Sequence, residues 1–391
     1  MPGLHIALCT DGIFPLATGG MQRHSRLLAE HLARMEGVTL TVFHPHPVGQ
    51  FAAMPEVREV HVPGIDPRRF YLAELWRCSA RMARALEAAM ARPHGPEVIF
   101  SQGFSVWKDI GHFSPRLVMH PHGLEMFQGL TRKERLMGLP FRLLVRRLAR
   151  RSAAVVSLGG KLTGILQRQL HGSGAQVLVL PNAVEVPVHA PAYPADNGPL
   201  RLVFVGRFAF NKGIDVLMEV AGRLVAGGLA SAVQFQLAGS GPLLERYQSM
   251  GLPPNVQLLG RVDDAALARL YAECHALVLP TRFEGMPTVV LEAMAQARPV
   301  FVSDVGAAAE LVTSGVNGYL LPPGDADALY KAVTQFMAES QDQRREMGLA
   351  GHGIAARRFA WPVVARQHLD ALLALRDAAD AQVAVQPKAA R

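Results

Sequence analysis

The sequence predicts an α/β protein built from two doubly wound, parallel-sheet domains. The chain has 391 residues, more than a single hydrophobic core usually holds, so two domains are expected. Short apolar, β-rich runs alternate with segments of helical periodicity in both halves, which is typical of parallel sheets covered by helices on both faces. A proline-rich stretch, VPVHAPAYPADNGP, separates the halves and is interpreted as a linker.

Strands and helices are expected to alternate in each half. In the first half, strands are predicted at 5–9, 40–44, 98–101, 117–120, 154–157 and 177–180, with helices at 23–33 and 71–91. In the second half, strands are predicted at 200–205, 234–238, 256–259, 276–279, 300–303 and 318–321, with helices at 215–225, 243–250 and 325–337. A last helical pattern covers about 361–379.

These elements set the expected domain limits. The N-terminal domain is predicted at 1–185, the linker at 186–199 and the C-terminal domain at 200–360, and residues 380–391 are expected to form a flexible tail. In open α/β sheets, ligands bind beyond the carboxyl ends of the strands. Functional residues are therefore expected in the turns that follow strands, beside a cleft between the two domains.

The composition excludes several classes of protein. Half of the residues are hydrophobic and 18% are charged, so the chain is globular rather than disordered. No apolar run reaches the ~18–20 residues that span a bilayer, and the start, MPGLHIALCTDG, resembles a first strand rather than a signal peptide, so a cytoplasmic location is expected. Cys9, Cys78 and Cys274 are scattered without metal-type spacing and indicate a reducing compartment.

The net charge of +8 suits an anionic ligand, a membrane surface or nucleic acid. Part of the excess lies in TRKERLMGLPFRLLVRRLARRS, residues 131–152, which holds eight basic residues and one acid among apolar residues. Such a segment could bind anionic lipid headgroups, or it could be an ordinary helix with a solvated basic face. No nucleic-acid motif accompanies the charge, so nucleic-acid binding is not expected.

Glycines or cations follow the first strand of each half. Gly19 and Gly20, in LATGGMQRHSRLLAEHL, precede a helix, where glycines let a ligand approach backbone N–H groups; the alternative is an ordinary loop. The dinucleotide fingerprint G-x-G-x-x-G is absent there. In RLVFVGRFAFNKGID, Arg207 and Lys212 lie between a strand and the next helix, an arrangement that suits a diphosphate; the alternative is a solvated basic loop.

A pair of carboxylates follows a later strand of the second half. In FEGMPTVVLEAMA, Glu284 lies in the loop before a helix that begins near Pro287, and Glu292 lies inside that helix. Carboxylates accept hydrogen bonds from hydroxyl groups, so sugar or ribose hydroxyls are the expected partners. The free amides around Gly285 and Met286 could add an anion site. The alternative is a helix with a stray surface acid.

Taken together, these motifs resemble the retaining GT-B glycosyltransferases, in particular family 4 (group 1). The E-x7-E pair, GGMQRH and VGRFAFNKGID occur with PHG, VVSLGGK, LPNAV, AGSGPLLE and LGRV in the family's order, over nearly the whole chain. The resemblance implies a GT-B fold, with two Rossmann-like doubly wound domains facing across a cleft and the last helix packing back on the N-terminal domain. The chain departs from the family pattern at Met286, Ala183 and Pro362.

The resemblance implies roles for the matching residues of both halves. Gly19 and Gly20 are expected near the donor diphosphate or the acceptor. His122, after the strand at 117–120, is expected to approach the donor sugar and the reacting centre; the alternative is a structural histidine. Arg207 and Lys212 are expected to bind the diphosphate and stabilise the leaving group.

The carboxylate segment completes the implied donor site. Glu284 is expected to hold hydroxyls of the donor sugar, with the amides of Gly285, Met286 and Pro287 nearby, and Glu292 is expected to hold the ribose. The base is expected near Arg261 and Val262. His122, Arg207, Lys212 and Glu284 form the predicted catalytic set.

The implied activity is transfer of a sugar, with retention, from a nucleoside-diphosphate sugar (UDP- or GDP-linked) to a glycan or lipid-linked acceptor in bacterial lipopolysaccharide, capsule or exopolysaccharide synthesis. No cofactor or metal is expected, because no D-x-D pair directly follows a strand. Residues 131–152 are a candidate contact with the cytoplasmic face of the inner membrane. A GT-B sugar-nucleotide 2-epimerase and a non-catalytic sugar-nucleotide-binding protein are the alternatives.

Overall fold

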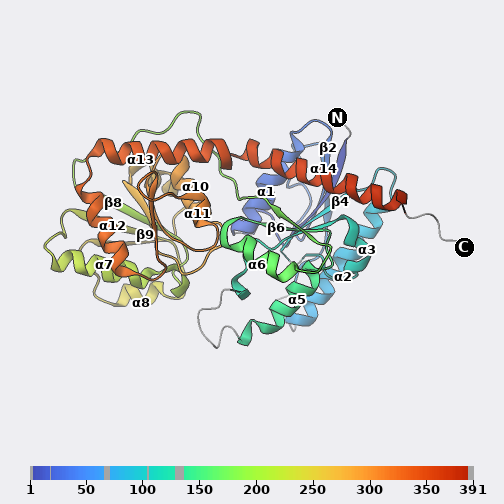
Figure 1. Cartoon of the computed structure of the whole chain (residues 1–391), viewed down its shortest axis with the longest axis horizontal. Helices are drawn as coiled ribbons and strands as arrows, with labels where there is room; N and C mark the ends of the chain where they lie inside the picture. Colours follow the sequence, from blue (N-terminus) through green and yellow to red (C-terminus); the bar gives the residue numbers. More distant parts are fainter. Residues whose placement is uncertain (1–2, 18, 66–70, 104, 128–135, 386–391) are drawn as a thin grey trace, which may run out of the picture. The chain divides into compact units, whose positions relative to one another are not determined.

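The computed structural model describes residues 3–17, 19–65, 71–103, 105–127 and 136–385 (Figure 1). The chain divides into two compact units. Unit 1 comprises Met1–Leu158, Leu162–Asn182 and Trp361–Arg391, and unit 2 comprises Gly159–Lys161 and Ala183–Ala360. Each unit contains one parallel sheet, which confirms the predicted pair of parallel-sheet domains.

The sheet of unit 1 has seven strands in the order β3-β2-β1-β4-β5-β6-β7. Its strands are β1 (Leu4–Cys9), β2 (Val38–His44), β3 (Val57–His61), β4 (Val98–Gln102), β5 (Leu117–His120), β6 (Ala154–Ser157) and β7 (Gln176–Val179). Its helices are α1 (Gly20–Ala33), α2 (Tyr71–Met90), α3 (Ile110–Phe113), α5 (Leu139–Ala149), most of α6 (Gly160–Leu170) and α14 (Trp361–Val385). The strand order reverses between β1 and β4, so the loops after these strands lie together at the carboxyl edge.

Alternating side chains of the central strands build two buried layers in unit 1. Ile99 of β4 and Met119 of β5 pack with α2 in one hydrophobic cluster. The neighbouring residues Phe100 and His120 point to the opposite face, where Phe100 meets His368 of α14. Because successive strand residues point to opposite faces, the polar His120 is placed in the layer under α1 and α14.

Among the described strands, β3 is the one that the sequence analysis missed. Its sequence, VREVH, places two charged residues in the middle of the run and therefore shows no continuous apolar pattern. β3 is an edge strand that pairs only with β2. The Glu59 carboxylate accepts hydrogen bonds from His44 Nε2 (2.9 Å) and from the amides of Gly49, Gln50 and Phe51 (2.9–3.0 Å), so this strand fixes the loop after β2.

The sheet of unit 2 has six strands in the order β10-β9-β8-β11-β12-β13. Its strands are β8 (Leu200–Val205), β9 (Val233–Ala238), β10 (Val256–Gly260), β11 (Ala276–Leu279), β12 (Val300–Ser303) and β13 (Gly318–Leu321). Its helices are α7 (Ile214–Ala226), α8 (Leu244–Ser249), α9 (Asp264–Glu273), α10 (Thr288–Ala295), α11 (Ala308–Leu311), α12 (Ala326–Ala338) and α13 (Gln341–Ile354), followed by a π-helical turn at Ala355–Phe359. The order reverses between β8 and β11, which brings their following loops together.

The proline-rich stretch is held along unit 2. The Arg298 guanidinium, buried in this unit, donates to the carbonyl of Ala192 (2.8 Å), and Tyr193 donates to the carbonyl of His275 (2.8 Å). Unit 2 ends at Ala360, and α14 of unit 1 begins at Trp361. Pro362 therefore lies in the first helical turn, where its missing N–H costs no hydrogen bond. None of the described helices is both long and apolar enough to cross a bilayer.

Candidate functional site

Two loops carry the charged residues at the switch point of unit 2. The loop after β8 leads to Lys212, and the loop after β11 leads to Glu284. Lys212 Nζ donates a hydrogen bond to Glu284 Oε1, and the two side chains are 21% and 13% exposed. The structure therefore brings together two residues that are 72 positions apart and that the sequence assigned to the diphosphate and to the donor sugar.

A network of backbone contacts fixes these two loops to each other. The carbonyl of Asn211 accepts hydrogen bonds from the Arg282 amide (2.7 Å) and the Thr281 hydroxyl (2.9 Å). Gly213 has φ +71°, and a Cβ placed there would lie 1.9 Å from the Pro280 carbonyl oxygen. Only glycine allows this close approach, so the position of Lys212 is defined by the β11 loop as well as by its own.

The side chain of Arg282 adds a second brace. It forms two hydrogen bonds with the Asp215 carboxylate (2.6 and 2.7 Å), donates to the Phe210 carbonyl (2.8 Å) and lies over the Phe210 ring at 4.1 Å. Such a forked pair is geometrically more restrictive than a lysine contact. Arg282 and Asp215 are thus supporting residues of the site that the sequence analysis did not single out.

Further glycines allow neighbouring loops to pack closely against one another at the same edge of the unit 2 sheet. A Cβ on Gly239, after β9, would lie 1.8 Å from the carbonyl oxygen of Gly206, after β8. A Cβ on Gly306, after β12, would lie 2.3 Å from the carbonyl oxygens of both Glu284 and Gly285. Hence Gly239 of the AGSGPLLE motif is explained by close packing of loops.

Helix α10 begins directly after the second loop. Pro287 is its N-terminal cap residue, and the helix begins at Thr288, where the sequence predicts it. Met286 is buried beneath it. The first turn contains no acidic residue, and its amides carry the positive end of the helix dipole, which favours an anion.

The second carboxylate lies inside α10, as expected. Glu292 Oε2 accepts a hydrogen bond from the hydroxyl of Tyr271 (2.9 Å), which comes from α9 and is itself buried. Tyr271 therefore orients Glu292. The tyrosine carried no recognisable signal in the sequence, because the contact depends on how α9 and α10 pack.

The remaining donor-site candidates of unit 2 lie at the same edge of the sheet but are more open to solvent. Arg207 lies two residues after the end of β8 and is exposed, and within the described part of the chain it makes no ion pair. Arg261 follows β10 and is also exposed, whereas Val262 is half-buried. Their roles in binding diphosphate and base stay predictions.

The candidates of unit 1 occupy the corresponding edge of its own sheet. Gly19 and Gly20 are exposed at the N-terminus of α1, after β1. His122 follows β5 and has a left-handed backbone with φ 58°, a conformation that is uncommon for residues other than glycine. Its Nε2 donates a hydrogen bond to Oε1 of Gln102, the fully buried last residue of β4.

Three other imidazoles lie around His122. The His122 ring stacks on the His120 ring, with 3.8 Å between centroids, and His24 of α1 lies edge-on to both at 5.2–5.3 Å. His368 of α14 is 6.0 Å from His24. Burial, together with repulsion from His368, lowers the pKa of His122 to about 3, so its imidazole is neutral near pH 7.

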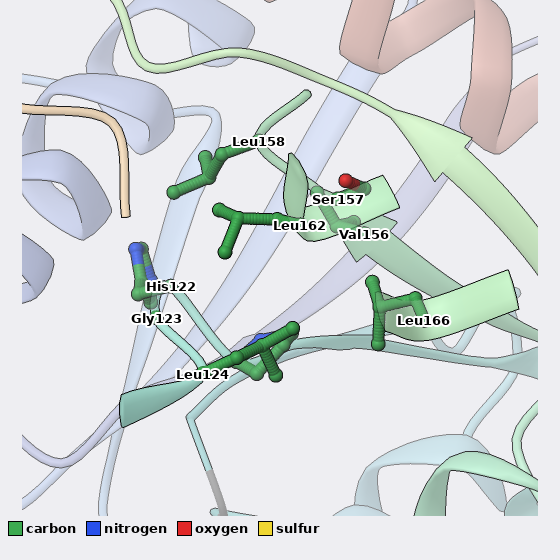
Figure 2. A pocket seen from close by; sticks show the side chains of 9 residues that line it. His122, Gly123, Leu124, Val156, Ser157, Leu158, Leu162 and Leu166 are labelled. Carbon is green, nitrogen blue, oxygen red and sulfur yellow. The ribbon is translucent and has the colours of Figure 1, made fainter. Parts of the chain in front are cut away.

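A small hollow lies beside His122. It is lined by Leu124, Leu158, Leu162 and Leu166, with His122 at its edge (Figure 2). Its volume of about 10 Å³ is enough for about one water molecule. The hollow is therefore too small to hold a sugar ring.

The predicted site residues divide between the two units. Gly19, Gly20 and His122 belong to unit 1, and the other predicted residues belong to unit 2. Within the described ranges, no three His, Cys, Asp or Glu side chains are arranged to hold a metal ion. Of the basic segment 131–152, residues 131–135 lie outside the described residues, and α5 forms most of the rest.

Comparison with known proteins adds an independent line of evidence. A family model described as Glycosyltransferase Family 4 matches residues 18–187, and one described as Glycosyl transferases group 1 matches residues 199–339. The phosphatidyl-myo-inositol mannosyltransferase of Mycobacterium leprae is 31% identical over 253 residues, or 62% of this chain. The match spans 61% of the length of that relative.

Solved structures are similar over almost the whole chain. Sucrose-phosphate synthase from Thermosynechococcus elongatus aligns with a TM-score of 0.78 and 23% identity, covering 96% of this chain and 100% of that one. Anabaena Alr3699/HepE in complex with UDP-glucose aligns with a TM-score of 0.66 and 18% identity, covering 95% and 100%. At these identities the likeness shows the fold, which is GT-B.

Proposed function

Since the chain belongs to the group 1, family 4 glycosyltransferases, we propose that it transfers a sugar from a nucleoside-diphosphate sugar to a glycan or lipid-linked acceptor. The contact between Lys212 and Glu284 carries this proposal. It places a cation suited to a diphosphate against a carboxylate suited to sugar hydroxyls, at the sheet edge where ligands of such folds bind.

Electrostatics would supply most of the catalysis. Breaking the sugar–phosphate bond places negative charge on the departing diphosphate, and Arg207, Lys212 and the first turn of α10 can stabilise it. Arg207 is free to form forked hydrogen bonds with phosphate oxygens, because it makes no ion pair among the described residues. These positive groups could do this without a bound metal, and we propose that none is needed.

His122 is suited to a different task. A neutral imidazole can donate from one nitrogen and accept at the other, and Nε2–H of His122 already donates its hydrogen bond to Gln102. This leaves the Nδ1 lone pair for a hydroxyl of the donor sugar. We include retention of anomeric configuration in the proposal because the motifs of the chain resemble those of retaining enzymes.

The donor base and the biological setting are proposed from relatives. One structural neighbour is a complex with UDP-glucose, which favours a UDP-sugar, and a sequence relative is named for mannosyl transfer to phosphatidyl-myo-inositol, which favours a lipid-linked acceptor. Synthesis of lipopolysaccharide, capsule or exopolysaccharide in bacteria is the setting that fits a lipid-linked acceptor.

Helix α5 supports contact with the cytoplasmic face of a membrane. Phe141 and Leu143 are 39% and 59% exposed, and Arg146 and Arg147 on the same helix are also exposed, while Val145 is buried against the unit. Exposed apolar residues beside cations suit an interface of anionic lipid headgroups.

The first test of the activity is thermal unfolding with UDP, GDP, ADP, dTDP and CMP, each without metal. A ligand at a hundredfold excess over its dissociation constant adds about 2.7 kcal/mol of apparent stability. We expect one diphosphate to raise the midpoint of unfolding, and the shift should be smaller in Lys212→Met. Incubation with the matching sugar nucleotide and a lipid-linked acceptor should then yield a product whose anomeric proton shows retention. Free epimerised sugar nucleotide without acceptor would indicate the epimerase instead.

Membrane contact is tested by co-sedimentation with vesicles of phosphatidylglycerol and phosphatidylcholine. Leu143→Ser should weaken binding, and Leu349→Ser on α13, which changes a leucine that is 41% exposed, is the matched control. Equal sedimentation of both variants and the wild type would refute the role of α5.

A further inference from the structure

In unit 2, the cation and the carboxylate of the candidate site form an ion pair with each other. Lys212 Nζ is hydrogen-bonded to Glu284, although the first is expected to hold phosphate and the second sugar hydroxyls. Both side chains are mostly buried, so their charges are less screened than those of a surface pair. A bound diphosphate must therefore compete with Glu284 for Lys212.

The loops that carry this pair cannot easily move apart. Gly213 lies against Pro280, the Arg282 amide and side chain hold the β8 loop, and Gly306 packs on the carbonyl of Glu284. Exchange of partners must therefore occur by rotation of the two side chains while the backbone stays in place.

We propose that the Lys212–Glu284 pair makes the site discriminate between the intact nucleotide sugar and the free nucleoside diphosphate. This inference rests on the proposed function. When an intact donor binds, Lys212 turns to the phosphates and the sugar hydroxyls donate to Glu284, so both charges regain partners. When the free diphosphate binds, Glu284 is left without its cation and without hydroxyl donors.

An unpartnered, mostly buried carboxylate beside an anion is costly. The free diphosphate therefore gains less from Lys212 than the intact donor does. After transfer, the sugar leaves the site attached to the acceptor, and Glu284 loses its hydroxyl donors. The Glu284 carboxylate then forms its ion pair with Lys212 again. Recovery of the ion pair thus weakens the hold on the product and favours its release.

The experiment is calorimetric titration of the full chain with UDP, GDP, ADP and dTDP, and with the sugar nucleotide of whichever base binds, in the absence of acceptor. Glu284→Gln should bind the free diphosphate roughly tenfold more tightly than the wild type, the order of one hydrogen bond to a charged group. The same variant should bind the sugar nucleotide no more tightly than the wild type. Glu219→Gln, which changes a carboxylate that is 60% exposed on α7, is the matched control and should change neither affinity.

A general repulsion between Glu284 and phosphate makes a different prediction. Without any role for the ion pair, Glu284→Gln would tighten binding of both ligands, and its effect on the diphosphate would be the same in a Lys212→Met background. Our proposal requires the effect to shrink to about twofold or less in that background, as a double-mutant cycle measures.

The outcomes separate the two proposals. Unchanged or weaker diphosphate binding by Glu284→Gln, or equal tightening of both ligands, overturns the discrimination by the pair while leaving the proposed transferase activity standing. Failure of the wild type to bind any diphosphate or sugar nucleotide overturns both.

Discussion

Buried histidines should make unit 1 sensitive to acid, and His368 allows the effect to be calculated. This residue of α14 is fully buried; its Nδ1 donates to the Val364 carbonyl (2.8 Å), and its Nε2 has no hydrogen-bond partner in the described structure. Burial lowers the pKa of His368 from 6.5 to about 4. The unfolded chain therefore takes up this proton first, and stability falls as the pH decreases from about 6.5 towards 4.

The size of the loss follows from the two pKa values. With 6.5 in the unfolded state and about 4 in the folded state, His368 alone should lower the free energy of unfolding by about 2 kcal/mol between pH 8 and pH 5. The pKa values of His24 and His120 are lowered by burial too, so the wild type loses more in total. His368→Gln should remove only the part of this free-energy loss that residue 368 causes, because glutamine does not titrate.

The assay is urea unfolding at pH 8 and pH 5, followed by tryptophan fluorescence. All three tryptophans of the chain, Trp76, Trp107 and Trp361, belong to unit 1, so the signal reports on this unit alone. The difference in unfolding free energy between the two pH values should be about 2 kcal/mol smaller in His368→Gln than in the wild type. An equal difference in both proteins would show that His368 has the same pKa in the folded and the unfolded state, and would refute the argument.

Three other substitutions test the site. Gly213→Ala should destabilise unit 2 by more than the ~1–2 kcal/mol of a strained left-handed residue, because the added methyl group would meet the Pro280 carbonyl. Gly222→Ala inside α7 should instead stabilise the unit by about 1 kcal/mol, and chemical unfolding measures both changes. Tyr271→Phe removes the hydrogen bond to the α10 carboxylate and should weaken binding of the nucleoside diphosphate about fivefold by calorimetry, with unchanged affinity contradicting its orienting role. Gln102→Leu should lower kcat about tenfold with little change in KM and should alter the His122 tautomer seen by ¹⁵N NMR; a wild-type spectrum would count against it.

The alternation of strands and helices was predictable because it depends on local patterns. Buried parallel strands such as β5 and β12 begin with three consecutive apolar residues, and their predicted limits are those observed. The edge strand β3 was missed because an edge tolerates Arg58 and Glu59, which interrupt such a run. The fold class therefore followed from the sequence more readily than the full strand count.

The site was predictable only in part, for a physical reason. The motifs placed Lys212 and Glu284 after strands, but their contact depends on the reversal of strand order between β8 and β11. The partners Gln102 and Tyr271 depend on packing between separate elements and have no local signature. One hint was available for Gln102, since it ends a strand next to the one that precedes His122.

The placement of α14 has a consequence for how the protein is made. The helix belongs to unit 1, yet the ribosome must first synthesise all of residues 183–360. At about 5–20 residues per second, the first strands wait roughly 10–40 s for the helix that covers one face of their sheet. During that time the layer around Phe100 and His120 is open to water. Unit 2 can therefore finish folding while unit 1 is still a substrate for chaperones.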